Sequence, residues 1–205
     1  MLNWAVNRLH RNTAMSDTPS VLRPQTGRET WVRAAMQTLA DAGLDGVKVE
    51  TLARQLGVTK GSFYWHFKDR RALLDAMLES WRDGRIEDIR SRTRAAPGQE
   101  IAQLQQLIDT YSLVRNRRGM QVELAVRDWA RHDPAARATL DEVDTVRLEC
   151  SAALFRAAGR SAEEAASRSL LLYAYVFGLG MMDSARDTPR PADTRAFIAN
   201  LITGG

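Results

Sequence analysis

Residues 59–68 bring together side chains that suit contact with a nucleic acid. The basic groups can donate hydrogen bonds to phosphate oxygens, while hydroxyl and aromatic groups can reach base edges or sugars. At about 100° per residue on a helix, Phe63 and Phe67 fall on one side and Trp65 on the other, with Tyr64 at the margin. We therefore expect the phenylalanines to pack inward and the Trp65 side to be a docking surface. The basic side chains that frame it are Lys60, His66, Lys68, Arg70 and Arg71.

The flanking residues predict the elements that hold this surface: a helix, a tight turn, a short helix and then a longer helix. Leu52, Ala53 and Leu56 recur at helical spacing, and Gly57 follows where a helix commonly ends. The hydroxyl of Thr59 can cap the short helix, and a new apolar run, which predicts a long helix into the 90s, starts near residue 70. Two helices joined by a few residues that include a glycine form a helix-turn-helix.

The segment from about residue 28 to 81 resembles the DNA-binding domain of the TetR family of bacterial transcriptional repressors. The motif that carries the resemblance is VTKGSFYWHFKDR at residues 58–70, after GVKVETLARQLG at residues 46–57. The resemblance implies DNA contacts from Thr59, Lys60, Gly61, Ser62, Tyr64, Trp65, His66 and Lys68. Lys60, Ser62, Tyr64 and Trp65 are the candidates for base edges or sugar, and Tyr64, His66 and Lys68 those for phosphates. Lys48 stands where the family usually has Ser or Thr, so a capping hydroxyl is lost and a cation that can contact phosphate is gained.

Charge is distributed unevenly along this 205-residue chain, whose formal net charge is +4. Residues 23–71 hold nine basic and five acidic side chains, whereas residues 72–205 hold eighteen and nineteen. A basic end on a near-neutral body fits a DNA reader joined to a domain with another task. A single cysteine, Cys150, excludes an internal disulfide and fits a reducing cytoplasm.

The pattern predicts an all-α protein of about nine helices, because no stretch alternates with period two. We expect a three-helix helix-turn-helix DNA-binding domain at residues 27–71 and a helical effector-binding and dimerisation domain at residues 72–205. Residues 1–26 are interpreted as a disordered arm or as a mis-called extension, with Met15 as the true start in the second case. The alternative is a basic arm that strengthens DNA binding.

Residues 170–182 form an apolar run of thirteen residues, LLLYAYVFGLGMM. A helix that is apolar on every side must be buried on every side, and thirteen residues are too few to cross a membrane. We therefore expect a second subunit to cover the face that one chain leaves open, with no membrane contact. The expected interface residues are Leu171, Tyr175, Gly178, Met182, Phe197 and Leu201. The resemblance implies a four-helix bundle of the last two helices with their symmetry mates, while a core helix in a monomer remains the alternative.

The family resemblance also implies that a small molecule enters the body and releases the protein from DNA. The candidate pocket residues are Trp81, Leu104, Ile108, Tyr111, Trp129, Tyr173, Phe177 and Met181. Their apolar, aromatic character favours a hydrophobic or aromatic effector. Charged residues could orient a polar ligand, although solvated helix faces are the simpler interpretation. These residues are Arg115, Glu123, Arg127 and Asp128.

The motifs of catalysis are absent from the sequence. Its three histidines have no metal-ligand spacing, and it contains no phosphate loop and no HExxH motif. We expect neither an enzyme nor a bound cofactor or metal. The predicted function is a cytoplasmic repressor that binds double-stranded palindromic operator DNA as a homodimer and is released by a small-molecule effector. The alternative is a DNA-binding regulator that has no small-molecule ligand and answers to a protein partner, for which the sign would be a body cavity too small for a ligand.

Overall fold

The computed structural model describes residues 27–112, 117–182 and 192–204, and within these ranges the chain forms nine helices and no strand. The first four helices are α1 (Arg28–Gly46), α2 (Val49–Gln55), α3 (Lys60–Tyr64) and α4 (Arg70–Arg92). The body contains α5 (Glu100–Ser112), α6 (Arg117–Trp129), α7 (Pro134–Ala157), α8 (Ala162–Met182) and α9 (Ala192–Thr203). The predicted all-α class is confirmed. Both interpretations of residues 1–26 concern residues outside the described ranges.

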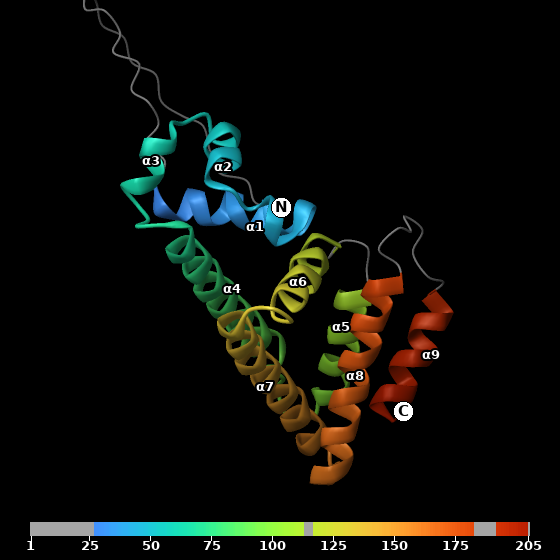
Figure 1. Ribbon diagram of the computed structural model, residues 1–205. Helices are drawn as coiled ribbons and strands as arrows, with labels where there is room; N and C mark the ends of the chain where they lie inside the picture. The colour runs from blue at the N-terminus through green and yellow to red at the C-terminus, as the bar shows by residue number, and fades with distance from the viewer. Residues whose placement is uncertain (1–26, 113–116, 183–191, 205) are drawn as a thin grey trace, which may run out of the picture.

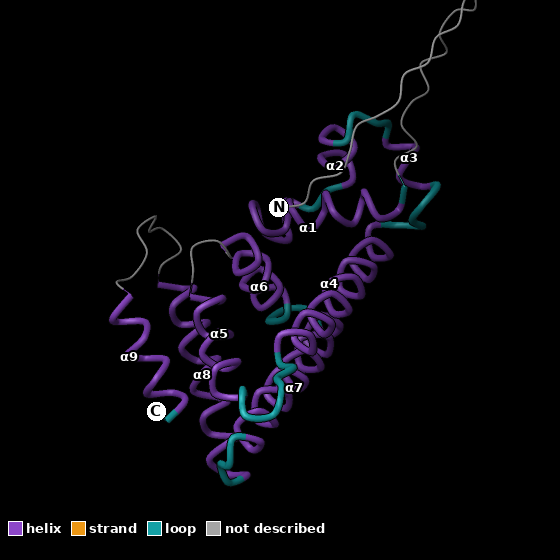
Figure 2. Tube along the Cα trace, turned by 180° about the vertical axis from the view of Figure 1, so that it is seen from behind, coloured by secondary structure: helices purple, strands orange, loops and turns teal. Residues whose placement is uncertain are grey.

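The helices form two regions joined by α4 (Figure 1). Helices α1, α2 and α3 gather at one end, and α4 descends from them alongside α7 into the body. Helix α6 lies between α1 and the rest of the body, while α8 and α9 form the edge farthest from α3, as the view from behind also shows (Figure 2). The N-terminal helices therefore contact the body through both α4 and α6.

Local sequence signals explain where the short helices begin and end. Gly57 adopts a positive φ of 66°, a conformation that favours glycine, in the turn before α3. Asp69 caps α4 by accepting a hydrogen bond from the backbone N–H of Ala72 at 2.9 Å. Thr59 does occupy the N-cap position of α3, but its side chain makes no capping hydrogen bond. The hydroxyl cap predicted for Thr59 is therefore wrong, although the helix begins where expected.

Two apolar clusters form the core. One extends from Trp31 in α1 through α2, α3 and α4 to Val143 in α7, and the other joins α5, α7, α8 and α9 around Phe155 and Leu172. The first cluster crosses the predicted boundary between residues 71 and 72 without interruption, because Leu73, on α4, is buried in it together with Trp31. The division into two domains remains a prediction, and the packing indicates that they are mechanically coupled.

Helix α8 is not covered on every side within one chain. Leu172 and Val176 are buried, but Leu170, Met181 and Met182 are 61%, 67% and 71% exposed. Among the described residues, α8 is the helix long and apolar enough by composition to cross a membrane, a test that a helix packed in a protein interior also passes. Helix α8 is 21 residues long, so it is longer than the thirteen-residue apolar run from which its length was predicted.

Candidate nucleic-acid interface and body cavity

An aromatic cluster fixes the orientation of α3. Phe63 is fully buried, and its ring lies 5.3 Å from that of Trp31 in an edge-to-face arrangement and 5.3 Å from that of Phe67 in a stacked one. Phe67 is 2% exposed, so both phenylalanines pack inward as predicted. Such ring pairs add specific geometry to the apolar burial. A helix of five residues therefore has a defined orientation despite its length.

The opposite side of α3 faces solvent. Trp65, at the C-cap of the helix, is 88% exposed, and Tyr64 is 55% exposed. The remaining predicted contact residues surround these rings, with Lys48, Thr59, Lys60, Gly61 and Lys68 exposed and Ser62 and His66 half-buried. A Cβ atom added at Gly61 would meet only the Thr59 hydroxyl within 4 Å, at 3.7 Å, so the space above Gly61 is open to an incoming backbone. The DNA contacts themselves stay a prediction.

Lys60 is held by an ion pair with Glu50 of α2. The hydrogen bond from Lys60 holds the pKa of Glu50 below its ordinary value, and the bond to Glu50 raises the pKa of Lys60. Both side chains are more than half exposed, so solvent and salt screen the attraction. Lys60 can therefore exchange Glu50 for a phosphate or a base at little cost.

Two arginines expected to frame the surface serve the fold instead. Arg70 donates from Nε to the carbonyl oxygen of Val47 at 2.7 Å and from Nη2 to that of Leu44 at 3.0 Å. Arg71 pairs with Asp75 at 2.8 Å and with Asp133, at the start of α7, at 2.6 Å. The expectation that Arg70 and Arg71 frame the surface as phosphate donors is not supported, because their guanidinium groups already have protein acceptors that tie α4 to neighbouring elements.

The predicted interface residues of α8 and α9 form an exposed apolar surface. Leu171, Met182, Phe197 and Leu201 are 49%, 71%, 67% and 64% exposed, and Tyr175 and Gly178 are half-buried. A Cβ atom added at Gly178 would meet nothing within 4 Å, so this glycine leaves open space on the helix surface. Exposed apolar area of this kind commonly marks an interaction surface. The pairing with a second subunit stays a prediction.

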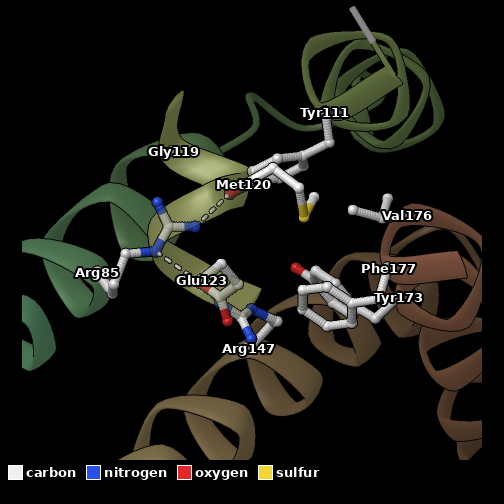
Figure 3. A pocket seen from close by; sticks show the side chains of 9 residues that line it. All are labelled: Arg85, Tyr111, Gly119, Met120, Glu123, Arg147, Tyr173, Val176 and Phe177. Atoms are coloured by element: carbon white, nitrogen blue, oxygen red, sulfur yellow. Dashed lines mark hydrogen bonds and ion pairs between the residues drawn. The ribbon is translucent and has the colours of Figure 1, made fainter. Parts of the chain in front are cut away.

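The body encloses a small cavity between α4, α5, α6, α7 and α8 (Figure 3). Its free volume is about 10 Å³, close to the minimum that holds one water. Of the eight predicted pocket residues, Tyr111, Tyr173 and Phe177 line it. Leu104 and Ile108 are buried in the body core. Trp81 and Trp129 belong to the other apolar cluster, and Met181 is 67% exposed.

A buried group of charges forms one wall of this cavity. Glu123 is 2% exposed, and its carboxylate accepts hydrogen bonds at 3.1 Å from both Arg127 and Arg147. Arg127 also forms a bidentate pair with Asp144 at 2.7 and 2.9 Å. The simpler interpretation of Glu123 as part of a solvated face is therefore wrong. Asp128 is exposed as that interpretation expects, while Arg115 lies outside the described residues.

Arg85 and Arg147 also line the cavity, although neither was predicted from the sequence to do so. Arg147 is 2% exposed and stands in the buried stripe of α7 between Val143 and Ser151. A charged residue at an inward position of an amphipathic helix is a signal that the sequence carries. Because its partner Glu123 is on another helix, the pattern alone does not show which group neutralises it. No group of three potential metal ligands occurs in the described part of the chain.

Comparison with known proteins places the N-terminal helices in a family. Residues 32–77 match the family described as bacterial regulatory proteins, tetR family. The chain is 47% identical over 53 residues to the class C tetracycline repressor of Escherichia coli, covering 26% of this chain and 24% of that protein. It is 29% identical over 163 residues to the class A repressor from transposon 1721, also of Escherichia coli, covering 78% of this chain and 68% of that protein. Several curated relatives are thus matched over only about a quarter of their length.

The fold of the whole chain also has counterparts among solved structures. A regulator from Saccharomonospora viridis, solved in complex with choline, matches with a TM-score of 0.70 and 18% identity over 86% of this chain and 95% of that one. At this identity the likeness shows a common fold and carries no information about ligand. It extends the similarity from the N-terminal helices to the body.

Proposed function

Because the chain belongs to the TetR family of bacterial regulatory proteins, we propose that it is a transcriptional repressor that binds a palindromic operator as a homodimer. The observation that carries this proposal is the outward face of α3, where Trp65 and Tyr64 are exposed beside lysines on a rigid aromatic base. A soluble domain gains nothing from exposing two large rings on a five-residue helix unless a partner binds there. We place this action in the cytoplasm, where the DNA of bacteria lies.

The proposed recognition divides the surface by chemistry. Lys60, Ser62, Tyr64 and Trp65 contact base edges or sugars, and His66, Lys68 and Lys48 contact phosphates together with the Tyr64 hydroxyl. The backbone of Thr59 and Gly61 approaches the DNA because neither position carries a bulky side chain. One such helix reads few bases, so specific binding needs two copies about 34–36 Å apart on successive major-groove faces.

The second copy is proposed to bind the exposed apolar surface of α8 and α9. Burying Phe197, Leu201 and Met182 removes large apolar side chains from water, each worth about 1.5–3 kcal/mol when fully buried. The open space at Gly178 lets the partner helix approach closely. This arrangement also places the dimer contact at the edge of the body far from α3, so that movements in the body change the separation of the two DNA-reading helices (Figure 1).

Release by a small molecule is proposed to act through the body cavity, although a specific observation favours the alternative. A free volume of about 10 Å³ accepts no effector without rearrangement, as expected of a regulator that answers to a protein partner. We favour ligand control because the cavity combines aromatic walls with convergent charged groups and one flexible side chain, that of Met120. The tetracycline and choline named for related proteins are not assigned to this chain.

The test is binding of the full chain to DNA from upstream of its own gene and to a scrambled fragment over a salt series, with the mass of each complex recorded. We expect preference for the natural fragment at physiological salt, with two or four chains bound. Trp65→Ala should remove that preference, while Trp4→Ala, in the N-terminal segment, should leave it unchanged. Equal and steeply salt-dependent binding to both fragments would mean that only phosphates are contacted, and would overturn the proposed operator specificity.

A further inference from the structure

We propose that the body cavity selects an effector carrying a carboxylate on an apolar ring, and that Arg85 binds the carboxylate. The inference rests on the proposed ligand control and specifies its chemistry. It replaces the expectation of a purely hydrophobic or aromatic effector.

Among the described residues, the charge group has one more cation than anions. Arg85, Arg92, Arg127 and Arg147 share the carboxylates of Asp88, Glu123 and Asp144. Distances show which guanidinium is least well paired. Arg127, Arg147 and Arg92 each have a carboxylate oxygen within 3.1 Å, whereas the nearest carboxylate oxygens to Arg85 lie at 3.4 and 3.5 Å.

Within the described part of the chain, Arg85 also lacks a well-formed hydrogen bond to a neutral group. Its Nη2 donates to the Tyr111 hydroxyl at 3.4 Å, and its buried Nε has no aligned acceptor even though Oε2 of Glu123 lies 3.4 Å away. The side chain is only 21% exposed, so water does not replace these contacts freely. A planar carboxylate matches the fork of a guanidinium with two parallel hydrogen bonds. The guanidinium lies at the cavity edge between Tyr111 and Glu123 (Figure 3).

The aromatic walls disfavour a cationic effector. The guanidinium of Arg127 lies 3.9 Å from the ring centre of Phe177, and Arg147 lies 5.1 Å from the same ring and 5.4 Å from that of Tyr173. These faces, which would attract a ligand cation, already hold protein cations. An added positive charge would also be repelled by Arg85 and Arg147. The ring edges, Val176 and Met120 remain for the apolar part of an anionic ligand.

Met120 is the flexible apolar side chain in the cavity wall. A Cβ atom added at Gly180 would lie 2.6 Å from Cγ and 2.7 Å from Sδ of Met120, so this side chain is packed closely on α8. Methionine has three rotatable bonds and repacks readily. Because Met120 lines the cavity, a change of its rotamer alters the free volume without unfolding a helix.

Arg85 is the α4 residue among those that line the cavity, and α4 begins six residues after α3 ends. A carboxylate that draws Arg85 inward therefore acts directly on the helix that carries the DNA-reading end. Binding energy that is gained only when α4 moves shifts the population toward the released state. The ligand's charged group is thus also the group that transmits the signal.

The test measures direct binding of benzoate, cinnamate and 2-naphthoate, each beside its primary amide, by calorimetry on the full chain without DNA. We expect at least one acid to bind roughly tenfold or more tightly than its amide, since hydrogen bonds to charged groups are the stronger ones. Met120→Ala should strengthen binding of that acid. Arg85→Gln should remove the difference between acid and amide, and Arg82→Gln, three residues away on the same helix but outside the cavity, should keep it.

Equal binding of acids and amides, in the natural protein and in Met120→Ala, would overturn the inference whether or not Arg85→Gln folds. Absence of binding by all six compounds to both proteins would overturn it as well. Operator binding, measured separately, distinguishes this failure from failure of the proposed function. A protein that selects its operator but ignores every acid is a regulator without this ligand class, and one that binds acids without operator preference is not the proposed repressor.

Discussion

The outward face of α3 and the wall of the body cavity use the same residue types in opposite ways. On α3 the rings and cations stand in solvent, and Lys60 is held only by an exposed pair with Glu50. In the cavity, buried and half-buried arginines and aromatic rings surround Glu123, which three guanidinium groups approach within 3.4 Å. The first arrangement keeps its groups available for a partner at small cost. In the second arrangement the charges neutralise one another away from solvent, so the loss of one partner has a large energetic cost.

Removal of the central carboxylate should produce the largest effect. Glu123→Ala leaves three arginines without their shared anion, and loss of one partner of a buried pair costs about 3–5 kcal/mol. Urea unfolding of the natural and variant proteins measures this loss. Glu149→Ala, which removes an exposed carboxylate from α7, is the matched control and should change stability little. A loss below about 1 kcal/mol for Glu123→Ala would show that the group is hydrated and weakly coupled.

A comparable loss is expected at the base of α3. Phe63→Ala empties a fully buried site between Trp31 and Phe67 and should destabilise the fold by about 3–5 kcal/mol. Tyr64→Ala, at the adjacent position, should leave unfolding nearly unchanged and weaken operator binding. Denaturation and DNA-binding curves of the two variants separate packing from contact. If Phe63→Ala were fully stable but unable to bind DNA, the assignment of inward and outward faces would be reversed.

The two glycines of α8 should respond differently to the same change. Alanine gains helix stability over glycine at both positions, but at Gly180 its Cβ atom meets Met120, whereas at Gly178 it meets nothing within 4 Å. Because the atoms in the way belong to the flexible side chain of Met120, which must change rotamer, we expect Gly180→Ala to be less stable than Gly178→Ala by at most about 1 kcal/mol. Gly178→Ala should instead weaken self-association, which sedimentation over a concentration series measures. Equal stability and equal association of both variants would remove the evidence for separate roles.

The smallest effect is expected where the exposed pair is broken. Glu50→Gln frees Lys60 and should raise operator affinity by a few-fold, because a weak surface pair no longer competes with DNA. Lys60 holds the pKa of Glu50 below its ordinary value, so the pair exists throughout pH 6–8 and is lost only as pH falls through that lowered value. The difference between the two proteins should therefore be constant over pH 6–8. Weaker binding by the variant would show that Glu50 positions Lys60 for DNA.

Predictions made from sequence periodicity were correct where a residue's position depends on its neighbours in the sequence. The inward position of Phe63, the exposed Trp65 and the start of a long helix near residue 70 each depend on spacing within one or two helices, and each was identified correctly. The Thr59 cap and the roles of Arg70 and Arg71 were not, because a side chain's partner depends on its three-dimensional neighbours. The carbonyl oxygens that Arg70 binds lie more than twenty residues earlier in the chain.

The residues by themselves determined the all-helical class, the helix-turn-helix and the chemistry available on α3, because these follow from local periodicity and from a contiguous motif. Only the tertiary structure decided that Arg85, Glu123 and Arg147, from three different helices, meet at one cavity, and that Met120 forms part of its wall. The cost of burying a charge depends on which opposite charge stands beside it. That pairing arises from the packing of distant segments, so no spacing rule within a single helix contains it.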